Sequence, residues 1–290
     1  GAQDYLLKPI DPYVLPMVLQ RAKASRQSAR LIEHERRNPN KTGEQFFFGD
    51  ALSDFRTQLD KITAADVRLC RNLSPVLIQG ETGTGKTSIA RWLHHNGPRK
   101  DSQLVEVNCP ALPENLAESE LFGHERGAFT DAKSARMGLF EAAKGGTLFL
   151  DELASLSLGI QAKILKTIED LRIRRLGGNR EIEVDVRIIA ASNRNLEQAS
   201  EEGDFRDDLL QRLSLFSLSI PPLRERGTDI VELAKHLLGK LCHGHQIEPK
   251  EISTEGKARL LGHTWRGNVR ELNHELERAI VFEEGDKWEF

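Results

Sequence analysis

Residues 80–87 read Gly80-Glu81-Thr82-Gly83-Thr84-Gly85-Lys86-Thr87, and they directly follow the apolar run Pro75-Val76-Leu77-Ile78-Gln79. This is the G-x-x-x-x-G-K-[ST] phosphate loop, whose backbone N–H groups surround the phosphates of a nucleoside triphosphate. We expect Lys86 to reach the terminal phosphates and the Thr87 hydroxyl to bind magnesium. The next residues, from Ser88 on, have the apolar spacing of a helix, whose N-terminus would face the anion. A glycine-rich turn without function is the alternative, but eight matching positions in this setting disfavour it. The predicted nucleotide-binding residues here are Gly80, Glu81, Thr82, Gly83, Thr84, Gly85, Lys86, Thr87 and Ser88.

The composition sets limits on the class of protein. A length of 290 residues suits one large domain with attachments or two modest domains. The formal net charge of -3 gives no overall basic field, so any nucleic-acid contact must be local. The three cysteines are far apart, which favours reduced thiols in a cytoplasmic protein. There is no signal peptide and no run approaching the roughly 18 apolar residues of a membrane span, and we expect no membrane association. The first residue is not Met, and we expect the chain to be an excised fragment.

The order of the apolar segments predicts an α/β fold. From Phe46 onward, strands alternate with helices, which is typical of a parallel sheet covered on both faces. After Pro221-Pro222 the pattern changes to helical stripes, and we expect a small all-helical subdomain. The expected strands are Val76 to Gln79, Leu104 to Asn108, Thr147 to Asp151, Val186 to Ser192 and Phe216 to Ile220. The helical stripes include Ile230, Leu233, Ala234, Leu237, Leu238 and Leu241, then Ala258, Leu260 and Leu261, then Val269, Leu272, Leu276 and Ile280.

A second element of the active site is predicted at residues 148–152, which read Leu-Phe-Leu-Asp-Glu. An apolar strand that ends in two acids, downstream of a phosphate loop, is a Walker B element. Asp151 is predicted to hold magnesium through water, and Glu152 to orient and deprotonate the water that attacks the γ-phosphate. The alternative is a buried strand that ends in a charged turn. Asn193, at the end of another expected strand, is placed to sense the γ-phosphate between the two motifs.

Several separated motifs together resemble one family. The segment Gly127-Ala128-Phe129-Thr130-Asp131-Ala132, preceded by Glu118 to Glu125, resembles the signature loop of bacterial enhancer-binding proteins, the AAA+ activators of sigma-54 RNA polymerase. The resemblance covers residues 46–285. It also rests on Asn108-Cys109-Pro110-Ala111-Leu112, Leu176-Gly177-Gly178, Phe205-Arg206 followed by Arg212, Pro221-Pro222-Leu223-Arg224-Glu225-Arg226, and Trp265-Arg266-Gly267-Asn268-Val269-Arg270-Glu271-Leu272.

The resemblance implies an AAA+ P-loop NTPase with a five-stranded parallel sheet and a C-terminal helical lid, using ATP and Mg²⁺. It implies a hexameric or heptameric ring in which Arg206 and Arg212 are arginine fingers that enter the neighbouring subunit's site. Without the family, those arginines would be assigned to surface salt bridges with the acids between them. By the same resemblance, Arg270 is the second sensor, Asn193 is the first sensor, and Asn108 restrains Glu152 until the γ-phosphate is in place.

The resemblance also predicts the partner and the domain order. Sigma-54 would contact the loop formed by Gly127, Ala128, Phe129, Thr130, Asp131 and Ala132. Residues 1–24 resemble the last strand and helix of a response-regulator receiver domain, and residues 25–45 are expected to be a linker. The ATPase subdomain is expected at 46–222 and the lid at 223–290. No helix-turn-helix follows residue 285, so promoter or enhancer DNA would be bound by a domain outside this fragment. Three arginines form either a basic patch or, as we expect, a hairpin with solvated side chains: Arg172, Arg174 and Arg175.

Three positions depart from the family pattern. Asp131 stands where glycine is usual, so the loop tip has less backbone freedom and an added carboxylate. Thr87 replaces the usual acid and restores the general phosphate-loop form, and Arg266 replaces the usual proline of the lid. The Asp131 tip leaves open an AAA+ regulator that is not coupled to sigma-54. A non-hydrolysing nucleotide-gated scaffold is a second alternative, which the intact Lys86 and Glu152 disfavour.

Overall fold

A computed structural model describes residues 46–290 except 131, 249, 283–286 and 289–290. These residues belong to one compact unit, Gln45–Phe290. The predicted receiver remnant at 1–24 and the linker at 25–45 lie outside the described residues, so both stay predictions.

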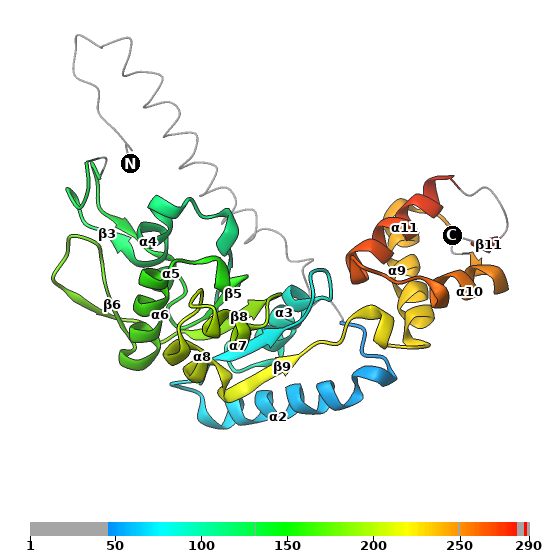
Figure 1. Cartoon of the computed structure of the whole chain (residues 1–290), viewed down its shortest axis with the longest axis horizontal. Helices are drawn as coiled ribbons and strands as arrows, with labels where there is room; N and C mark the ends of the chain where they lie inside the picture. The colour runs from blue at the N-terminus through cyan, green and yellow to red at the C-terminus, as the bar shows by residue number, and fades with distance from the viewer. Residues whose placement is uncertain (1–45, 131, 249, 283–286, 289–290) are drawn as a thin grey trace, which may run out of the picture. The chain divides into compact units, whose positions relative to one another are not determined.

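A parallel five-stranded sheet forms the centre of this unit (Figure 1). Its strand order is β2-β5-β8-β1-β9, and every neighbouring pair is parallel. All five strands lie where the sequence predicts them, and the α/β fold class is confirmed. Only β8 and β9 are shorter than expected. The bounds are β1 Val76–Gln79, β2 Leu104–Asn108, β5 Thr147–Asp151, β8 Arg187–Ser192 and β9 Ser217–Ser219.

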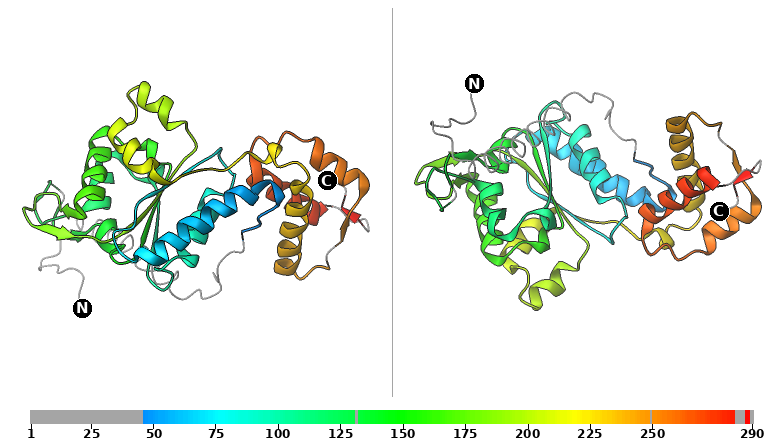
Figure 2. Two further views of the ribbon diagram at one scale, coloured as in Figure 1. Left: turned by 90° about the horizontal axis from the view of Figure 1, so that it is seen from below. Right: turned by 90° about the horizontal axis from the view of Figure 1, so that it is seen from above.

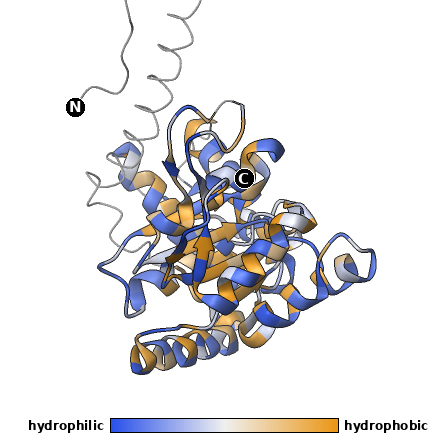
Figure 3. Ribbon diagram, turned by 90° about the vertical axis from the view of Figure 1, so that its left-hand side faces the viewer, coloured by the Kyte–Doolittle hydropathy of each residue, from blue (hydrophilic) through white to orange (hydrophobic). Residues whose placement is uncertain are grey.

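The central strands β1, β5 and β8 are buried on both faces of the sheet, to which successive side chains of a strand point in turn. In β5, Leu148 and Leu150 belong to one hydrophobic cluster, whereas Phe149 between them belongs to another. Ile188 and Ile189 of β8 divide in the same way. Helices accordingly cover both faces (Figure 2), and the strands are largely apolar in Figure 3. This is why the strand segments read as continuous apolar runs.

Two helices cover one face of the sheet and the others cover the opposite face. The first group is α2, Ser53–Leu69, and α3, Lys86–Asn96. The second group is α4 Glu114–Phe122, α5 Leu139–Ala142, α6 Leu158–Asp170, α7 Leu196–Glu201 and α8 Asp207–Leu213. Two antiparallel strand pairs extend from this side, β3 Gly123–His124 with β4 Arg136–Met137, and β6 Arg172–Arg174 with β7 Glu181–Glu183. Short 3-10 helices are η1 Asp50–Leu52, η2 Cys109–Ala111, η3 Leu153–Ser155, η4 Ser214–Phe216 and η5 Leu223–Glu225.

The C-terminal subdomain has its own hydrophobic core, which begins at Leu223. Its helices are α9 Asp229–His245, α10 Thr254–Gly262 and α11 Asn268–Phe282. The expectation of an all-helical subdomain is wrong in one respect, because β10, Glu251–Ile252, pairs in parallel with β11, Lys287–Trp288. This pairing brings the Trp288 side chain into the core, where it is buried.

Two predicted core positions of this subdomain are also wrong. Leu260 is buried, but Ala258 and Leu261 are exposed. Successive residues of a helix point about 100° apart, so a narrow apolar stripe that holds Leu260 does not include residues one or two positions away.

Two predictions about the chain as a whole can be compared with the described residues. All three cysteines are free, as expected for reduced thiols. Among the helices that the structure describes, none combines the length and the apolar character needed to cross a membrane.

Candidate nucleotide site

The phosphate loop connects the end of β1 to the start of α3. Gly83 has φ +82° and Gly85 has φ +105°, conformations that residues with a Cβ atom rarely adopt. Between them Thr84 is fully buried, and its hydroxyl donates to the carbonyl of Glu81 at 2.8 Å. The loop is therefore held in one shape by its own contacts. It ends at the N-terminus of α3, which carries the partial positive charge of the helix dipole.

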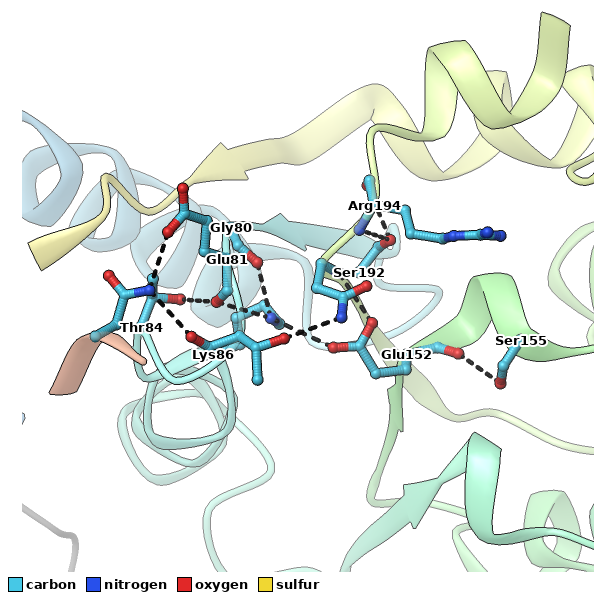
Figure 4. A network of polar contacts seen from close by, with 11 residues as sticks. Gly80, Glu81, Thr84, Lys86, Glu152, Ser155, Ser192 and Arg194 are labelled. Carbon is cyan, nitrogen blue, oxygen red and sulfur yellow. Dashed lines mark hydrogen bonds and ion pairs between the residues drawn. The ribbon is translucent and has the colours of Figure 1, made fainter. Parts of the chain in front are cut away.

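Lys86 lies beneath this loop with its side chain only 6% exposed. Its Nζ donates to the carbonyls of Gly80 at 2.8 Å and Glu81 at 3.2 Å. Glu152 Oε1 is 3.5 Å from the same Nζ (Figure 4). A buried ammonium group needs such partners. The predicted phosphate-binding cation is thus directed toward the Walker B acid.

Asp151, the last residue of β5, supplies an oxygen that fits a bound cation. Its Oδ1 is buried and has no hydrogen-bond partner among the described residues. Burial and, second, the Glu152 carboxylate raise the pKa of Asp151, whereas Lys86 and Arg270 lower it. A buried carboxylate oxygen without a donor is suited to a hard divalent cation, and Thr87 in the first turn of α3 offers a hydroxyl. No group of three or more His, Cys, Asp or Glu able to hold a metal occurs in the described part of the chain. This donor set is the kind that holds Mg²⁺ together with substrate phosphates.

Glu152 and Asn193, predicted from separate strands, are brought into contact. Glu152 Oε2 accepts a hydrogen bond from the Asn193 backbone N–H at 2.9 Å. The Asn193 side chain donates to the Thr82 hydroxyl at 3.0 Å, so Asn193 joins the Walker B acid to the phosphate loop. Glu152 itself has φ +56°, a left-handed conformation that costs a residue with a Cβ atom about 1 kcal/mol or more. Such strain at a side chain aimed into the site is typical of functional positions.

Asn108 lies close to these acids but does not hold Glu152 directly. The register of the sheet places Asn108 beside Asp151 at the ends of β2 and β5. Within the described ranges, however, no hydrogen bond joins the Asn108 side chain to Glu152, whose carboxylate is bound by Asn193 and Lys86. The restraint of Glu152 by Asn108 therefore stays a prediction, and the contact seen is a different one.

The lid reaches the site through α11. Arg270, in the first turn of this helix, lies close enough to Asp151 to lower the pKa of that carboxyl. The N–H of Val269 donates to the Gly83 carbonyl at 3.0 Å, which ties the same turn to the phosphate loop. The predicted sensor residue Arg270 and the loop are thus brought together, while Ser88 lies in the first turn of α3.

The two predicted arginine fingers lie on one short helix. Arg206 precedes the first residue of α8, and Arg212 lies in its last turn. The Arg206 guanidinium makes two hydrogen bonds to the Asp208 carboxylate, at 3.0 and 2.6 Å. These bonds raise the pKa of Arg206 and lower that of Asp208. The salt bridge considered as an alternative therefore exists, and within the described residues neither arginine is bonded to residues 80–87 of its own chain.

The segment 127–132 forms a closed loop. The N–H of Gly127 donates to the carbonyl of Ala132 at 2.8 Å, and the N–H of Ala132 donates to the carbonyl of Phe129 at 2.9 Å. The Phe129 ring lies 5.1 Å from that of His124 in an edge-on arrangement. Thr130 is exposed. Asp131 lies outside the described residues, and Ala128 contacts the hairpin of β6 and β7, where a Cβ at Gly177 would lie 2.8 Å from that of Ala128.

The three arginines of that hairpin are paired with acids. Arg172 and Arg174 both bind Glu181, and Arg175 binds Glu141 and Glu125. The Glu141 hydrogen bonds raise the pKa of Arg175. The expected hairpin is present, and its charges are largely compensated rather than gathered in a basic patch.

Three residues with no predicted role, Arg224, Arg226 and Asn268, hold the phosphate loop. Arg224 makes two hydrogen bonds to the Glu81 carboxylate, at 2.9 and 2.7 Å, and Arg226 donates to the Thr84 carbonyl at 3.1 Å. The Asn268 side chain donates to Glu81 and to the Thr82 carbonyl. All three residues lie in motifs quoted above, Pro221 to Arg226 and Trp265 to Leu272. The signal available in the sequence was the presence of these polar side chains within the two motifs.

Comparison with known proteins gives consistent results. The Sigma-54 interaction domain family matches residues 51–219, and the AAA+ ATPase lid domain family matches residues 224–289. The chain is 42% identical over 285 residues to the regulatory protein AtoC of Escherichia coli, covering 98% of this chain and 61% of AtoC. It is 46% identical over 227 residues to the transcriptional regulatory protein FlbD of Caulobacter vibrioides, covering 77% of this chain and 50% of FlbD. The chain thus spans about half to three fifths of the length of these relatives.

Solved structures resemble most or all of the chain. The crystal structure of NtrX from Brucella abortus in complex with ATP has a TM-score of 0.74 and 32% identity, covering 100% of this chain and 64% of that one. A RuvB structure from Thermotoga maritima has a TM-score of 0.57 at 16% identity, covering 83% of this chain and 66% of that one, and supports the fold alone.

Proposed function

The chain belongs to the Sigma-54 interaction domain family of AAA+ proteins, and from this membership we propose that it is an ATP-hydrolysing module that remodels sigma-54 RNA polymerase holoenzyme to activate transcription. The observation that carries the proposal is the contact of Glu152 with Lys86 on one side and Asn193 on the other. It joins the phosphate loop, the Walker B acid and the first sensor in one site.

Binding of ATP is assigned to the phosphate loop. The N–H groups of residues 80–87 and the dipole of α3 favour the phosphates, and Lys86 adds a full positive charge. Thr87 and Asp151 would hold Mg²⁺, which when bound neutralises charge on the phosphate oxygens. The solved NtrX structure in complex with ATP supports nucleotide as the ligand.

Hydrolysis is assigned to Glu152. Its carboxylate is held 3.5 Å from Lys86 Nζ, and a γ-phosphate beside Lys86 would lie within reach of a water bound to Glu152. Glu152 orients this water and accepts its proton as the oxygen attacks the phosphorus in line with the leaving group. Asn193, which contacts both Glu152 and Thr82, is suited to relay the state of the γ-phosphate.

Completion of the site is assigned to a neighbouring subunit. Arg206 and Arg212 supply positive charge to the transferring phosphoryl group of the adjacent chain, so hydrolysis requires a hexameric or heptameric ring. Arg206 must leave Asp208 to do so, because the two side chains are bonded to each other.

The loop at 127–132 is assigned to sigma-54. Exposed Thr130 and half-buried Phe129 are available to a partner, and within the described residues no hydrogen bond or ion pair joins this loop to residues 80–87. We place the protein in the cytoplasm, with promoter or enhancer DNA bound by a region outside residues 1–290.

The test is ATP turnover followed by capture of purified sigma-54 in the presence of ADP and aluminium fluoride. Turnover together with capture is the expected result. Turnover without capture would favour an AAA+ regulator that does not act on sigma-54, and nucleotide binding without turnover would favour a nucleotide-gated scaffold.

A further inference from the structure

The side chain of Asn268 connects three separate parts of the protein. It is fully buried and lies at the first residue of lid helix α11. Its Oδ1 accepts from the N–H of Leu223 in η5 at 2.7 Å. Its Nδ2 donates to Glu81 Oε2 at 3.0 Å and to the Thr82 carbonyl at 3.1 Å. One amide group therefore uses its acceptor for the joint between the subdomains and its donors for the phosphate loop.

Neighbouring contacts strengthen this connection. The N–H of Val269 binds the Gly83 carbonyl at 3.0 Å, and a Cβ at Gly83 would lie 2.2 Å from the Gly267 carbonyl oxygen. The backbones of loop and lid are thus in direct contact. From η5, Arg224 donates to both oxygens of the Glu81 carboxylate, including the Oε2 that Asn268 binds. Arg224 and Asn268 together lower the pKa of Glu81 to about 2.

We propose that Asn268 is a positioning residue that fixes α11 to residues 81–83, so that the phosphate loop determines the position of Arg270. Arg270 is only two residues beyond Asn268, in the same helical turn as Val269. A change in the loop when nucleotide binds is then passed to the lid through Asn268, and the lid turns about this point. This inference rests on the proposed nucleotide site and adds a residue to which that site assigned no role.

The test compares the same substitution at two asparagines of α11. Asn268→Asp keeps the acceptor for Leu223 but removes both donors and sets a second carboxylate against Glu81. Asn273→Asp is the matched control, because Asn273 has no side-chain hydrogen bond within the described residues. The readouts are the dissociation constant for a fluorescent ADP analogue with Mg²⁺ and hydrogen–deuterium exchange of the amides at 268–272.

We expect Asn268→Asp to weaken binding of the ADP analogue by about tenfold and to speed exchange of the Val269 amide, while Asn273→Asp stays within about twofold of the parent. In the Glu81→Gln background, Asn268→Asp should weaken binding of the ADP analogue by less than about threefold, because the amide of the introduced glutamine can donate to the new carboxylate. A merely structural role for Asn268 would not produce this rescue.

Unchanged binding and unchanged Val269 exchange in a folded Asn268→Asp protein would overturn the proposal, as would an equal loss in both backgrounds. If the variant does not fold, Glu81→Ala removes the same contact from a partly exposed position and must likewise speed Val269 exchange. If the parent binds no nucleotide, the proposed function fails instead, and Val269 exchange without nucleotide still decides the role of Asn268.

Discussion

The phosphate loop and the loop at 127–132 are both glycine-containing turns, but the protein holds them very differently. The phosphate loop is bonded to side chains that follow β5 and β8 and to side chains of η5 and α11, including Lys86–Glu152 and Asn268–Glu81. The 127–132 loop is closed by its own backbone, and its other contacts are the ring contact between Phe129 and His124 and the packing of Ala128 on the β6–β7 hairpin. Phosphoryl transfer requires charged groups that are already in position, whereas a loop that binds a partner protein must be able to move. Substitutions around the phosphate loop should therefore change the rate of ATP hydrolysis. Substitutions in the loop at 127–132 should change sigma-54 capture.

The largest expected effect on the ATPase rate comes from removing the arginines that a neighbouring subunit contributes to the nucleotide site. Arg206→Ala or Arg212→Ala should lower turnover by roughly 1,000-fold or more, because an arginine finger stabilises charge in the transition state. Nucleotide affinity of the monomer should not change. The parent's specific activity should also rise with protein concentration in a steady-state assay.

Arg278→Ala is the control for loss of an arginine, since the Arg278 side chain is 70% exposed on α11 and, among the described residues, forms an ion pair with Glu275 alone. It should stay within about twofold of the parent. Turnover that is independent of concentration in a demonstrably monomeric sample would contradict the arginine-finger role.

The next effect is at the Walker B acid. Glu152→Gln should slow turnover by about 100-fold or more and retain ATP binding, because it removes the general base but not the phosphate ligands. Lys86→Ala should instead lose binding, which a fluorescent nucleotide titration measures. Parental turnover by Glu152→Gln would show that the Walker B assignment is wrong.

A small effect on the ATPase is expected in the second region. Thr130→Ala should keep at least about half of the ATPase rate, since Thr130 is exposed and outside the site, and should abolish sigma-54 capture. Exposed Ser134, just beyond the loop, provides the control Ser134→Ala, which should retain both activities. A severe loss of turnover in Thr130→Ala would erase the contrast between the two regions.

The smallest effect on turnover is expected at Asp131. Asp131→Gly restores the usual residue of the family loop and its backbone freedom, so sigma-54 capture should equal or exceed that of the parent. ATPase rate should be unchanged in the same preparation. If both proteins fail to capture sigma-54 where a known activator succeeds, coupling to sigma-54 is refuted.

Much of the fold follows from local patterns. The five strands were predictable because a buried parallel strand is a short apolar run, and a phosphate loop requires a strand before it and a helix after it. The pairing of β10 with β11 was not predictable, since each strand has only two residues. Trp288 is placed next to Ile252 only when the hydrophobic core of the lid forms.

The charged groups of the nucleotide site could be identified from the sequence: Lys86 after a glycine-rich turn, and Asp151 and Glu152 at the end of an apolar strand. These features are local, and a few consecutive residues suffice to define them. Which polar groups come into contact depends on the folded chain. Glu152 binds the backbone of Asn193 because β5 and β8 are neighbours in the sheet, and Asn268 reaches Glu81 across a separation of 187 residues because the lid docks on the loop. Such contacts depend on sheet order and on docking geometry, and neither leaves a periodic pattern in the chain.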